Sequence, residues 1–230
     1  MKNPFTYLLE LFFPRRCAIC HDVLQDFEDG ICLHCHAKLP RIAPDTIFSQ
    51  KLEKLFWGKF PLGKVASYCY YQKGNDTTTL IHQLKYKGRP DLGVTLGRLM
   101  ATELQARHFF EGIDILIPVP LHPHKEKIRG YNQSLCIAQG IAAITHLPID
   151  HTSLQRTHYT ETQTHKSADA RWNNVSGRFA LPHPELLAHR HILLIDDVLT
   201  TSATLTACAD TFHEVPDIRI SILTLGWAAY

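Results

Sequence analysis

Two adjacent acids followed by a run of hydroxyl residues form the stretch best suited to chemistry. It reads HILLIDDVLTTSATLTACAD over residues 191–210, with four apolar residues before Asp196 and Asp197. The apolar run predicts a buried strand, so both acids are expected where the strand leaves the core, open to solvent or to ligand hydroxyls. A turn opening a helix should follow, where unpaired backbone N–H groups and the helix dipole favour an anion. The sequence therefore predicts a phosphate-binding loop made of Leu199, Thr200, Thr201, Ser202, Ala203 and Thr204.

Other interpretations of this stretch explain less of it. An ordinary N-cap after a buried strand accounts for one hydroxyl residue, but not for four together with an acid pair. A Walker-type loop needs G-x4-G-K-[ST], which the sequence lacks. A phosphoacceptor receiver domain keeps its acid pair near the start of the chain, whereas only one further strand is predicted after this one.

Four cysteines near the start of the chain are spaced for a metal ion. Two C-x2-C pairs, separated by eleven residues, are formed by Cys17, Cys20, Cys32 and Cys35. Such pairs turn the backbone so that four thiolates can hold Zn²⁺ tetrahedrally. Two disulfides are unexpected in an intracellular protein, and a thioredoxin-like redox role requires only one pair. The pattern predicts structural zinc, and a closed four-thiolate site leaves no position for a substrate.

Basic residues cluster in three further places. Arg129 and Tyr131, with two lysines just before them, could hold pyrophosphate or a nucleic-acid backbone, with the ring available for base stacking. A solvated basic loop explains Lys125 and Lys127 equally well. Residues 156–178 have few apolar anchors and predict a loop whose cations are Arg156, Lys166, Arg171 and Arg178. The third cluster, Lys85, Lys87 and Arg89, is most simply a solvated helix end.

The periodicity of the remaining chain predicts the elements that must position these residues. Strands are expected at 64–71, 114–121, 191–196 and 218–226, and helices at 75–88, 90–109, 132–145 and 202–213. Apolar strands that alternate with helices indicate an α/β fold with a parallel sheet covered on both faces. Ligands of such sheets bind beyond the carboxyl ends of the strands, where the phosphate loop is expected.

Composition limits the organisation of the chain. Its 230 residues are 45% hydrophobic, enough for a small module followed by a medium domain. We expect an N-terminal helix, the cysteine module and a linker over 1–59, and the α/β domain over 60–230. No apolar run is long enough to span a membrane, and the N-terminus is a poor signal peptide, so a cytoplasmic protein without stable membrane insertion is expected. A net charge of +2 does not by itself indicate nucleic-acid binding.

The stretch at 191–204 resembles the PRPP-binding motif of type I phosphoribosyltransferases, which is an apolar strand, two acids and Thr-Thr-Gly-x-Thr. The resemblance implies that Asp196 and Asp197 hold the ribose 2′ and 3′ hydroxyls and that residues 199–204 surround the 5′-phosphate. It also implies Mg²⁺ bound with PRPP. Ser202 stands where the motif usually has glycine.

Longer stretches resemble the ComF family of competence proteins, including GntX-like members. They are IPVPLHPHKEKIRGYNQS (117–134), QTHKSADARWNNVSGRF (163–179) and the four-cysteine front end. The resemblance implies a type I phosphoribosyltransferase-like domain preceded by a zinc ribbon, and a role in natural transformation with single-stranded DNA and a helicase partner. Segment 156–178 resembles the loop that closes over PRPP in transferases. Two functions stay open: a DNA-uptake protein that binds PRPP or a similar sugar phosphate, and an active transferase in which Asp196 and Asp197 act on PRPP and an unidentified base.

Overall fold

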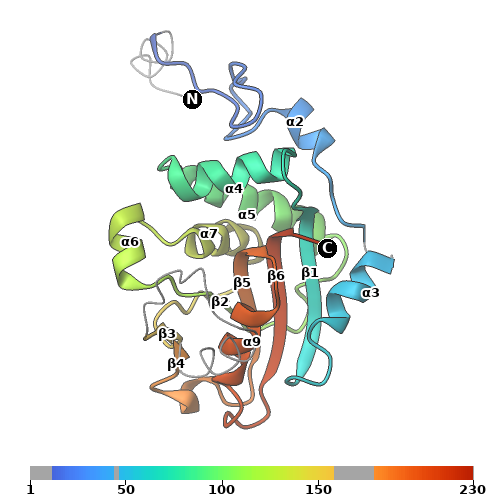
Figure 1. The fold of residues 1–230 in the computed structure, drawn as a ribbon, viewed down its shortest axis with the longest axis vertical. Coiled ribbons are helices and arrows are strands. Elements are labelled where there is room, and N and C mark those ends of the chain that lie inside the picture. The colour runs from blue at the N-terminus through green and yellow to red at the C-terminus, as the bar shows by residue number, and fades with distance from the viewer. Residues whose placement is uncertain (1–11, 44–46, 158–178, 230) are drawn as a thin grey trace, which may run out of the picture.

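A four-stranded parallel sheet forms the centre of the protein (Figure 1). The computed structural model describes residues 12–43, 47–157 and 179–229. The sheet has the order β1-β6-β5-β2, and every neighbouring pair is parallel. Its strands are β1 (Leu62–Tyr70), β2 (Ile115–Pro118), β5 (His191–Leu199) and β6 (Arg219–Trp227). The predicted parallel α/β sheet is therefore confirmed.

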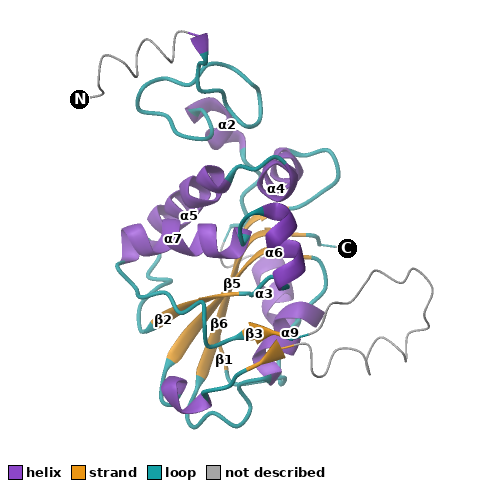
Figure 2. Ribbon diagram, turned by 90° about the vertical axis from the view of Figure 1, so that its left-hand side faces the viewer, coloured by secondary structure: helices purple, strands orange, loops and turns teal. Residues whose placement is uncertain are grey.

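Helices cover both faces of the sheet, as Figure 2 shows. One face is covered by α4 (Asp76–Tyr86), α5 (Pro90–Gln105) and α7 (Gln133–Thr145), and the other by α3 (Ile47–Lys54) and α9 (Ala203–Asp210). Alternate residues of each strand enter two separate cores: Leu193 and Ile195 pack toward α4, α5 and α7, whereas Ile192 and Leu194 pack toward α3 and α9. This burial on both faces explains the uninterrupted apolar strands of the sequence.

Two glycines allow α5 and α7 to touch backbone to backbone. A Cβ added at Gly97 would lie 2.1 Å from the carbonyl oxygen of Ile137, and one added at Gly140 would lie 2.1 Å from that of Val94. Both contacts are with backbone atoms, so they cannot be relieved by a side-chain rotation. The close approach fixes α7, whose first residues reach the acid pair described below.

We expect Gly97→Ala to lower the free energy of unfolding by about 1–3 kcal/mol, because the new methyl group must push α5 and α7 apart. Urea denaturation followed by circular dichroism measures the change. Thr102→Ala, at an exposed position of the same helix, is the matched control and should change stability by less than about 0.5 kcal/mol. Equal stability of the two variants would contradict the close helix contact.

The cysteine-containing module lies at the far end of the molecule and rests on α5 (Figure 1). Thr95 of α5 donates its hydroxyl proton to Asp29 over 2.9 Å. Gly30 adopts a positive φ of 66°, and a Cβ there would lie 3.1 Å from Leu92. Arg41, which follows α2 (Leu33–Lys38), donates one hydrogen bond of 2.8 Å to each carboxylate oxygen of Glu103. Polar and apolar contacts thus attach the module to the body.

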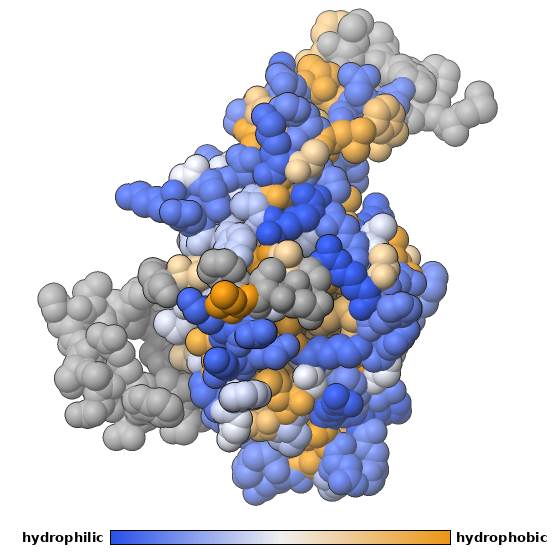
Figure 3. Space-filling model, turned by 90° about the vertical axis from the view of Figure 1, so that its right-hand side faces the viewer, coloured by the Kyte–Doolittle hydropathy of each residue, from blue (hydrophilic) through white to orange (hydrophobic). Residues whose placement is uncertain are grey.

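The outer surface of the module is partly apolar. Figure 3 shows apolar atoms among polar ones on the projecting upper part of the molecule. Its large exposed apolar side chains are Phe12, Phe13, Val23, Phe27 and Leu33. This surface also carries two arginines, Arg15 and Arg16.

Several elements differ from the expectation. Strand β5 continues through both acids to Leu199, because residues 196–199 pair with β6 from Thr224 to Trp227. A short helix, α6 (Pro123–Arg129), replaces the expected basic loop, with Gly130 ending it at a φ of 86°. Helix α5 ends at Gln105 and β2 is shorter than expected. The small elements that remain are antiparallel β3 (Gln155–Arg156) and β4 (Phe179–Ala180), and the 3-10 turn η1 (Pro184–Leu187).

Some expectations concern residues that the structure does not describe. The N-terminal apolar helix and most of segment 156–178 lie outside the described residues. The division at residues 59 and 60 stays a prediction; α3 packs against β1, and Leu52 and Phe56 are buried in the core beneath it. Among the described residues, no helix is long and apolar enough to cross a membrane.

Candidate functional site

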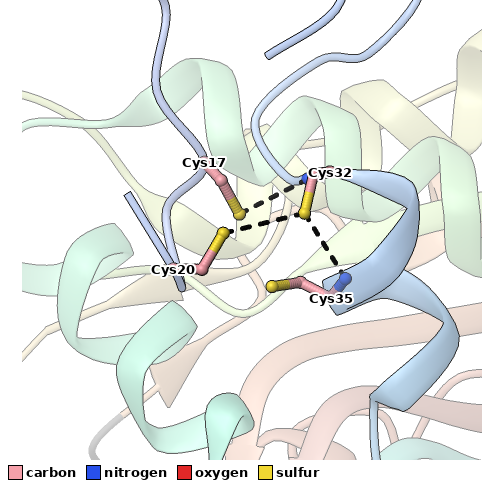
Figure 4. A group of neighbouring side chains, drawn as sticks. All are labelled: Cys17, Cys20, Cys32 and Cys35. Atoms are coloured by element: carbon pink, nitrogen blue, oxygen red, sulfur yellow. Dashed lines mark hydrogen bonds between the residues drawn. The ribbon is translucent and has the colours of Figure 1, made fainter. Parts of the chain in front are cut away.

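The four predicted metal ligands converge on one point (Figure 4). The sulfur atoms of Cys17, Cys20, Cys32 and Cys35 all lie within 4.8 Å of one another. The Sγ atoms of Cys20 and Cys32 are 3.8 Å apart. Four sulfurs bound tetrahedrally at about 2.3 Å from a metal ion would be about 3.8 Å from each other. The cluster can therefore hold a structural metal ion without large movement.

Backbone amides around the cluster favour thiolates. The N–H of Cys32 donates to Cys17 Sγ over 3.4 Å, and the N–H of Ile19 does so over 3.5 Å. Burial alone would raise the pKa of Cys17, but these amides and that of Cys20 lower the pKa to about 7. The N–H of Cys35 likewise donates to Cys32 Sγ, because Cys32 is the N-cap of α2. The thiolate of Cys17 is thus stabilised before a cation binds, whereas burial raises the pKa of Cys35.

At the carboxyl edge of the sheet, the two acids have different surroundings. Asp197 is 3% exposed, and both of its carboxylate oxygens accept protein donors. Lys85 Nζ lies 2.9 Å from Oδ1, and Gln133 Nε2 donates to Oδ2 over 2.7 Å. The expectation that both acids are open to solvent or ligand is wrong for Asp197, because the continued pairing of β5 with β6 keeps it inside the sheet.

Asp196 is the more accessible acid. It is half-buried, and its Oδ1 accepts hydrogen bonds from Ser134 Oγ at 3.0 Å and from the N–H of Asp197 at 2.9 Å. Burial, and after it the negative charge of Asp197, raises the pKa of Asp196 to about 7. Among the described residues, no further donor reaches its Oδ2. This oxygen can accept hydroxyl groups of a ligand.

The predicted phosphate loop joins β5 to α9. Thr200 and Thr201 are exposed, and Ser202 is the N-cap of α9 without a side-chain capping bond. Ser202 has φ −67° and ψ −7°, which is the ordinary right-handed region, so this position does not require the glycine of the motif. No described residue hydrogen-bonds the hydroxyls of Thr200, Thr201 or Thr204. The loop presents several donors at a helix start.

Lys59 reaches this loop from a distant part of the sequence. Its Nζ donates to Ser202 Oγ over 2.9 Å. The turn that carries Lys59 is anchored by the fully buried Phe56 and passes through Gly58 at a φ of 70°. A cation at the N-terminal end of a helix is electrostatically unfavourable unless an anion lies between them. Lys59 therefore strengthens the assignment of this loop as an anion site.

Four cations lie close to one another, and two of them, Lys85 and Arg129, are linked to Asp197. Partial burial, and then the charges of Arg156, Arg129 and Lys85, lower the pKa of Lys125, which shows that these groups are close together. Arg129 donates to Gln133 Oε1, so Gln133 joins the guanidinium of Arg129 to the carboxylate of Asp197. The structure thus brings two of the predicted cationic contacts, Arg129 and Arg156, to the predicted site.

Tyr131 supports the site from within. Its hydroxyl donates to the carbonyl of Leu84 and accepts the N–H of Arg89 at 3.1 Å. The phenol thus fixes the end of α4 and the start of α5, and its ring packs against the core. The predicted contacts Lys166 and Arg171 lie outside the described residues.

Sequence reasoning missed Lys59, Lys85 and Ser134. The sequence predicts a solvated helix end for Lys85, although a lysine in the last turn of a helix that follows a strand can reach the edge where ligands bind. Ser134 is the second residue of α7, after the Asn132 cap and Gln133, and helix starts of this kind also face that edge. No local signal marks Lys59, because it lies 143 residues from Ser202.

The chain is similar in sequence to proteins named for DNA utilization and for competence. It is 35% identical over 133 residues to DNA utilization protein YhgH of Escherichia coli O157:H7, which covers 56% of this chain and 58% of that protein. It is 26% identical over 234 residues to Competence protein F of Haemophilus influenzae, covering 94% of this chain and 99% of that protein. The matches to YhgH thus span little more than half of its length.

Solved structures show weaker similarity, and no protein-family model matches the chain. The allosteric regulatory enzyme of purine biosynthesis is 16% identical, with a TM-score of 0.41 over 61% of this chain and 29% of that chain. Glutamine PRPP amidotransferase from B. subtilis is 18% identical, with a TM-score of 0.39 over 61% of this chain and 30% of that one. From the sequence similarities, the chain is a homologue of the proteins named competence protein F and DNA utilization protein YhgH, which confirms the resemblance to the ComF family.

Proposed function

We propose that the protein binds PRPP or a similar sugar phosphate at the carboxyl edge of its sheet. The observation that carries the proposal is the set of groups gathered at this edge. They are an anion loop reached by Lys59, the open Oδ2 of Asp196, and a group of four cations. A 5′-phosphate, ribose hydroxyls and a diphosphate would meet these groups in that order. Charge-assisted hydrogen bonds of this kind are about twice as strong as neutral ones.

The biological role that we infer is DNA uptake. Similarity to Competence protein F extends over nearly the whole of both chains, which supports this role. Exposed Phe13 and Phe27 near Arg15 and Arg16 offer aromatic surfaces and cations suited to single-stranded DNA. A helicase of DNA uptake is the proposed protein partner, and the cytoplasm is the proposed location. DNA affinity carried by arginines should fall steeply as salt increases.

An active phosphoribosyltransferase is the second candidate, and the ordered anion and hydroxyl contacts around Asp196 favour it. A nucleophile would then displace pyrophosphate from C1′, and the cations near Arg129 would stabilise the leaving group. The resemblance implies Mg²⁺ bound with PRPP. We propose that any such ion is bound by the diphosphate of the ligand and not by the acids of the protein.

Zinc is the metal that we propose for the four-cysteine cluster. Tetrahedral four-thiolate sites are typical of Zn²⁺, and a site with four protein ligands leaves no open position. The role of this ion is therefore structural.

Calorimetric titration of the full chain with PRPP tests the sugar-phosphate proposal. Pyrophosphate release is then measured on the same sample, with and without candidate bases. Binding with release supports the transferase, and binding without release supports a sensor linked to DNA handling. A chain that does not bind PRPP under any ionic condition contradicts the proposal.

Natural transformation tests the DNA-uptake role directly. A Haemophilus influenzae strain that lacks competence protein F should regain transformation when it expresses this chain. A chain that is produced in folded form and restores nothing would contradict the role.

Lys59→Met should weaken the binding of ribose 5-phosphate about tenfold, because one charged donor to the phosphate is lost. Affinity for inorganic pyrophosphate should stay the same, since we expect that anion to meet the cations around Arg129 and not the loop. Calorimetry with each ligand gives both values. Lys54→Met, at an exposed position of α3, is the control. An unchanged affinity for ribose 5-phosphate would remove Lys59 from the site.

A further inference from the structure

Lys85 forms an ion pair with Asp197, the second acid of the pair. Its side chain is 20% exposed and that of Asp197 is 4% exposed, and the ion pair measures 2.9 Å. The second carboxylate oxygen accepts the amide of Gln133 over 2.7 Å. The other end of this amide accepts Arg129, which fixes its orientation. Asp197 is thus fully paired by protein groups.

This arrangement does not fit a magnesium ion coordinated by Asp197. Mg²⁺ requires oxygen ligands at about 2.0–2.1 Å in near-octahedral geometry. An ammonium group on one oxygen and an amide N–H on the other leave neither oxygen for the metal. Asp196 offers only Oδ2, because its Oδ1 already accepts two hydrogen bonds.

The ammonium of Lys85 is held in place by its helix. The buried residues Leu80, Ile81 and Leu84 anchor α4 in the core. Tyr131 binds the carbonyl of Leu84 at the end of the same helix. Withdrawal of Lys85 would also leave the carboxylate of Asp197 buried without its partner charge, which is strongly unfavourable.

Nearby cations can neutralise a diphosphate without a metal. Arg129, Arg156 and Lys125 lie near Lys85, and their mutual repulsion is relieved when an anion binds among them. The guanidinium of Arg129 also lies 5.9 Å from the centre of the Tyr86 ring, which helps to position it. Lys85 pairs with Asp197, so a diphosphate is expected to meet the other three basic side chains.

We propose that Lys85 is a resident cation that takes the place of a divalent metal at Asp197, so that the site binds the diphosphate ester PRPP without Mg²⁺. The inference rests on the proposed sugar-phosphate function and deepens it. Lys85 is a positioning residue: it keeps Asp197 paired and thereby directs the ligand to Asp196 and the remaining cations.

The test is a pair of calorimetric titrations of the full chain with PRPP, one in EDTA and one in excess Mg²⁺. The wild-type dissociation constants should agree within about threefold. Lys85→Met should bind about 30-fold more weakly in EDTA, and Mg²⁺ should restore much of this loss because the carboxylate of Asp197 is then open to it. Lys87→Met, an exposed neighbour at the end of the same helix, should behave like the wild type in both titrations.

The outcomes distinguish a failure of this inference from a failure of the proposed sugar-phosphate function. Wild-type binding that is lost in EDTA and present in Mg²⁺ would overturn the inference and leave the sugar-phosphate function standing. Absence of binding in both conditions would contradict the function itself. If Lys85→Met does not fold, the wild-type pair of titrations still decides, and Lys85→Arg, which keeps the charge, should remain independent of Mg²⁺.

Discussion

Replacement of Asp196 by asparagine is expected to weaken PRPP binding by about 100-fold or more, because two charge-assisted hydrogen bonds to sugar hydroxyls are lost. Oδ2 of Asp196 is the acceptor that the described residues leave open, whereas Asp197 is already paired. Calorimetric titration measures the loss. Retained affinity in a folded Asp196→Asn protein would show that the sugar does not bind at this acid.

The same substitution should change the pH dependence of stability. The pKa of Asp196 is raised to about 7 in the folded protein, so between roughly pH 4 and 7 the folded state keeps a proton that the unfolded state has released. This contribution to stability is complete at acidic pH and is lost as the pH rises through about 7. Asp196→Asn removes the effect, and at pH 8 the variant should be about 2 kcal/mol more stable than the wild type. Urea denaturation of the wild type and the variant at pH 5 and pH 8 measures how the difference in stability changes with pH.

Asp197→Asn provides the contrasting control for the acid pair. It removes the partner of Lys85 at a site that is nearly inaccessible to water, so the free energy of unfolding should fall by about 3 kcal/mol at neutral pH. One acid thus acts mainly on binding and the other mainly on stability. Equal behaviour of the two variants would contradict the distinct roles that the geometry gives them.

Removal of the metal is expected to unfold the N-terminal module, because structural zinc sites of this kind contribute about 10–16 kcal/mol of binding free energy to folding. The purified protein should contain one zinc ion per chain. A strong chelator should abolish the part of the near-ultraviolet circular dichroism signal that comes from the module and not from tryptophan, while the sheet domain stays folded. Cys17→Ser should have the same effect without a chelator. Metal analysis and circular dichroism give the two readouts.

His34→Ala is the matched control for the metal site, since His34 is exposed and lies between two of the cysteines. It should leave metal content and stability unchanged. Protein that is purified without zinc, or a Cys17→Ser variant as stable as the wild type, would contradict a structural ion.

The sequence alone determined the features whose signals are local. Two C-x2-C pairs predicted the cluster of sulfurs, because the spacing itself folds each pair toward one point. The uninterrupted apolar runs predicted the parallel sheet, since only strands buried on both faces lack polar alternation. The hydroxyl residues after Leu199 predicted a helix start at Ser202, where α9 begins.

Only the tertiary structure decided how the two acids differ. Charged residues usually mark a strand end, so the sequence placed both acids at the end of the strand, yet pairing with β6 carries β5 on to Leu199. Successive side chains of a strand point to opposite faces. Asp197 therefore turns toward α4 and α7, where Lys85 and Gln133 meet it. Asp196 lies on the other face, where its charge helps to raise the pKa of the buried Cys208 of α9, although its Oδ1 still accepts a hydrogen bond from Ser134 at the start of α7.

The cations that complete the site were beyond sequence reasoning for the same reason. Lys59 and Ser202 are separated by 143 residues, and Gln133 and Asp197 by 64. Periodicity and spacing describe neighbours within a helix or a strand. Contacts between separate elements depend on how the sheet orders its strands, and that order brings α4, α6 and α7 to the edge that carries the acid pair.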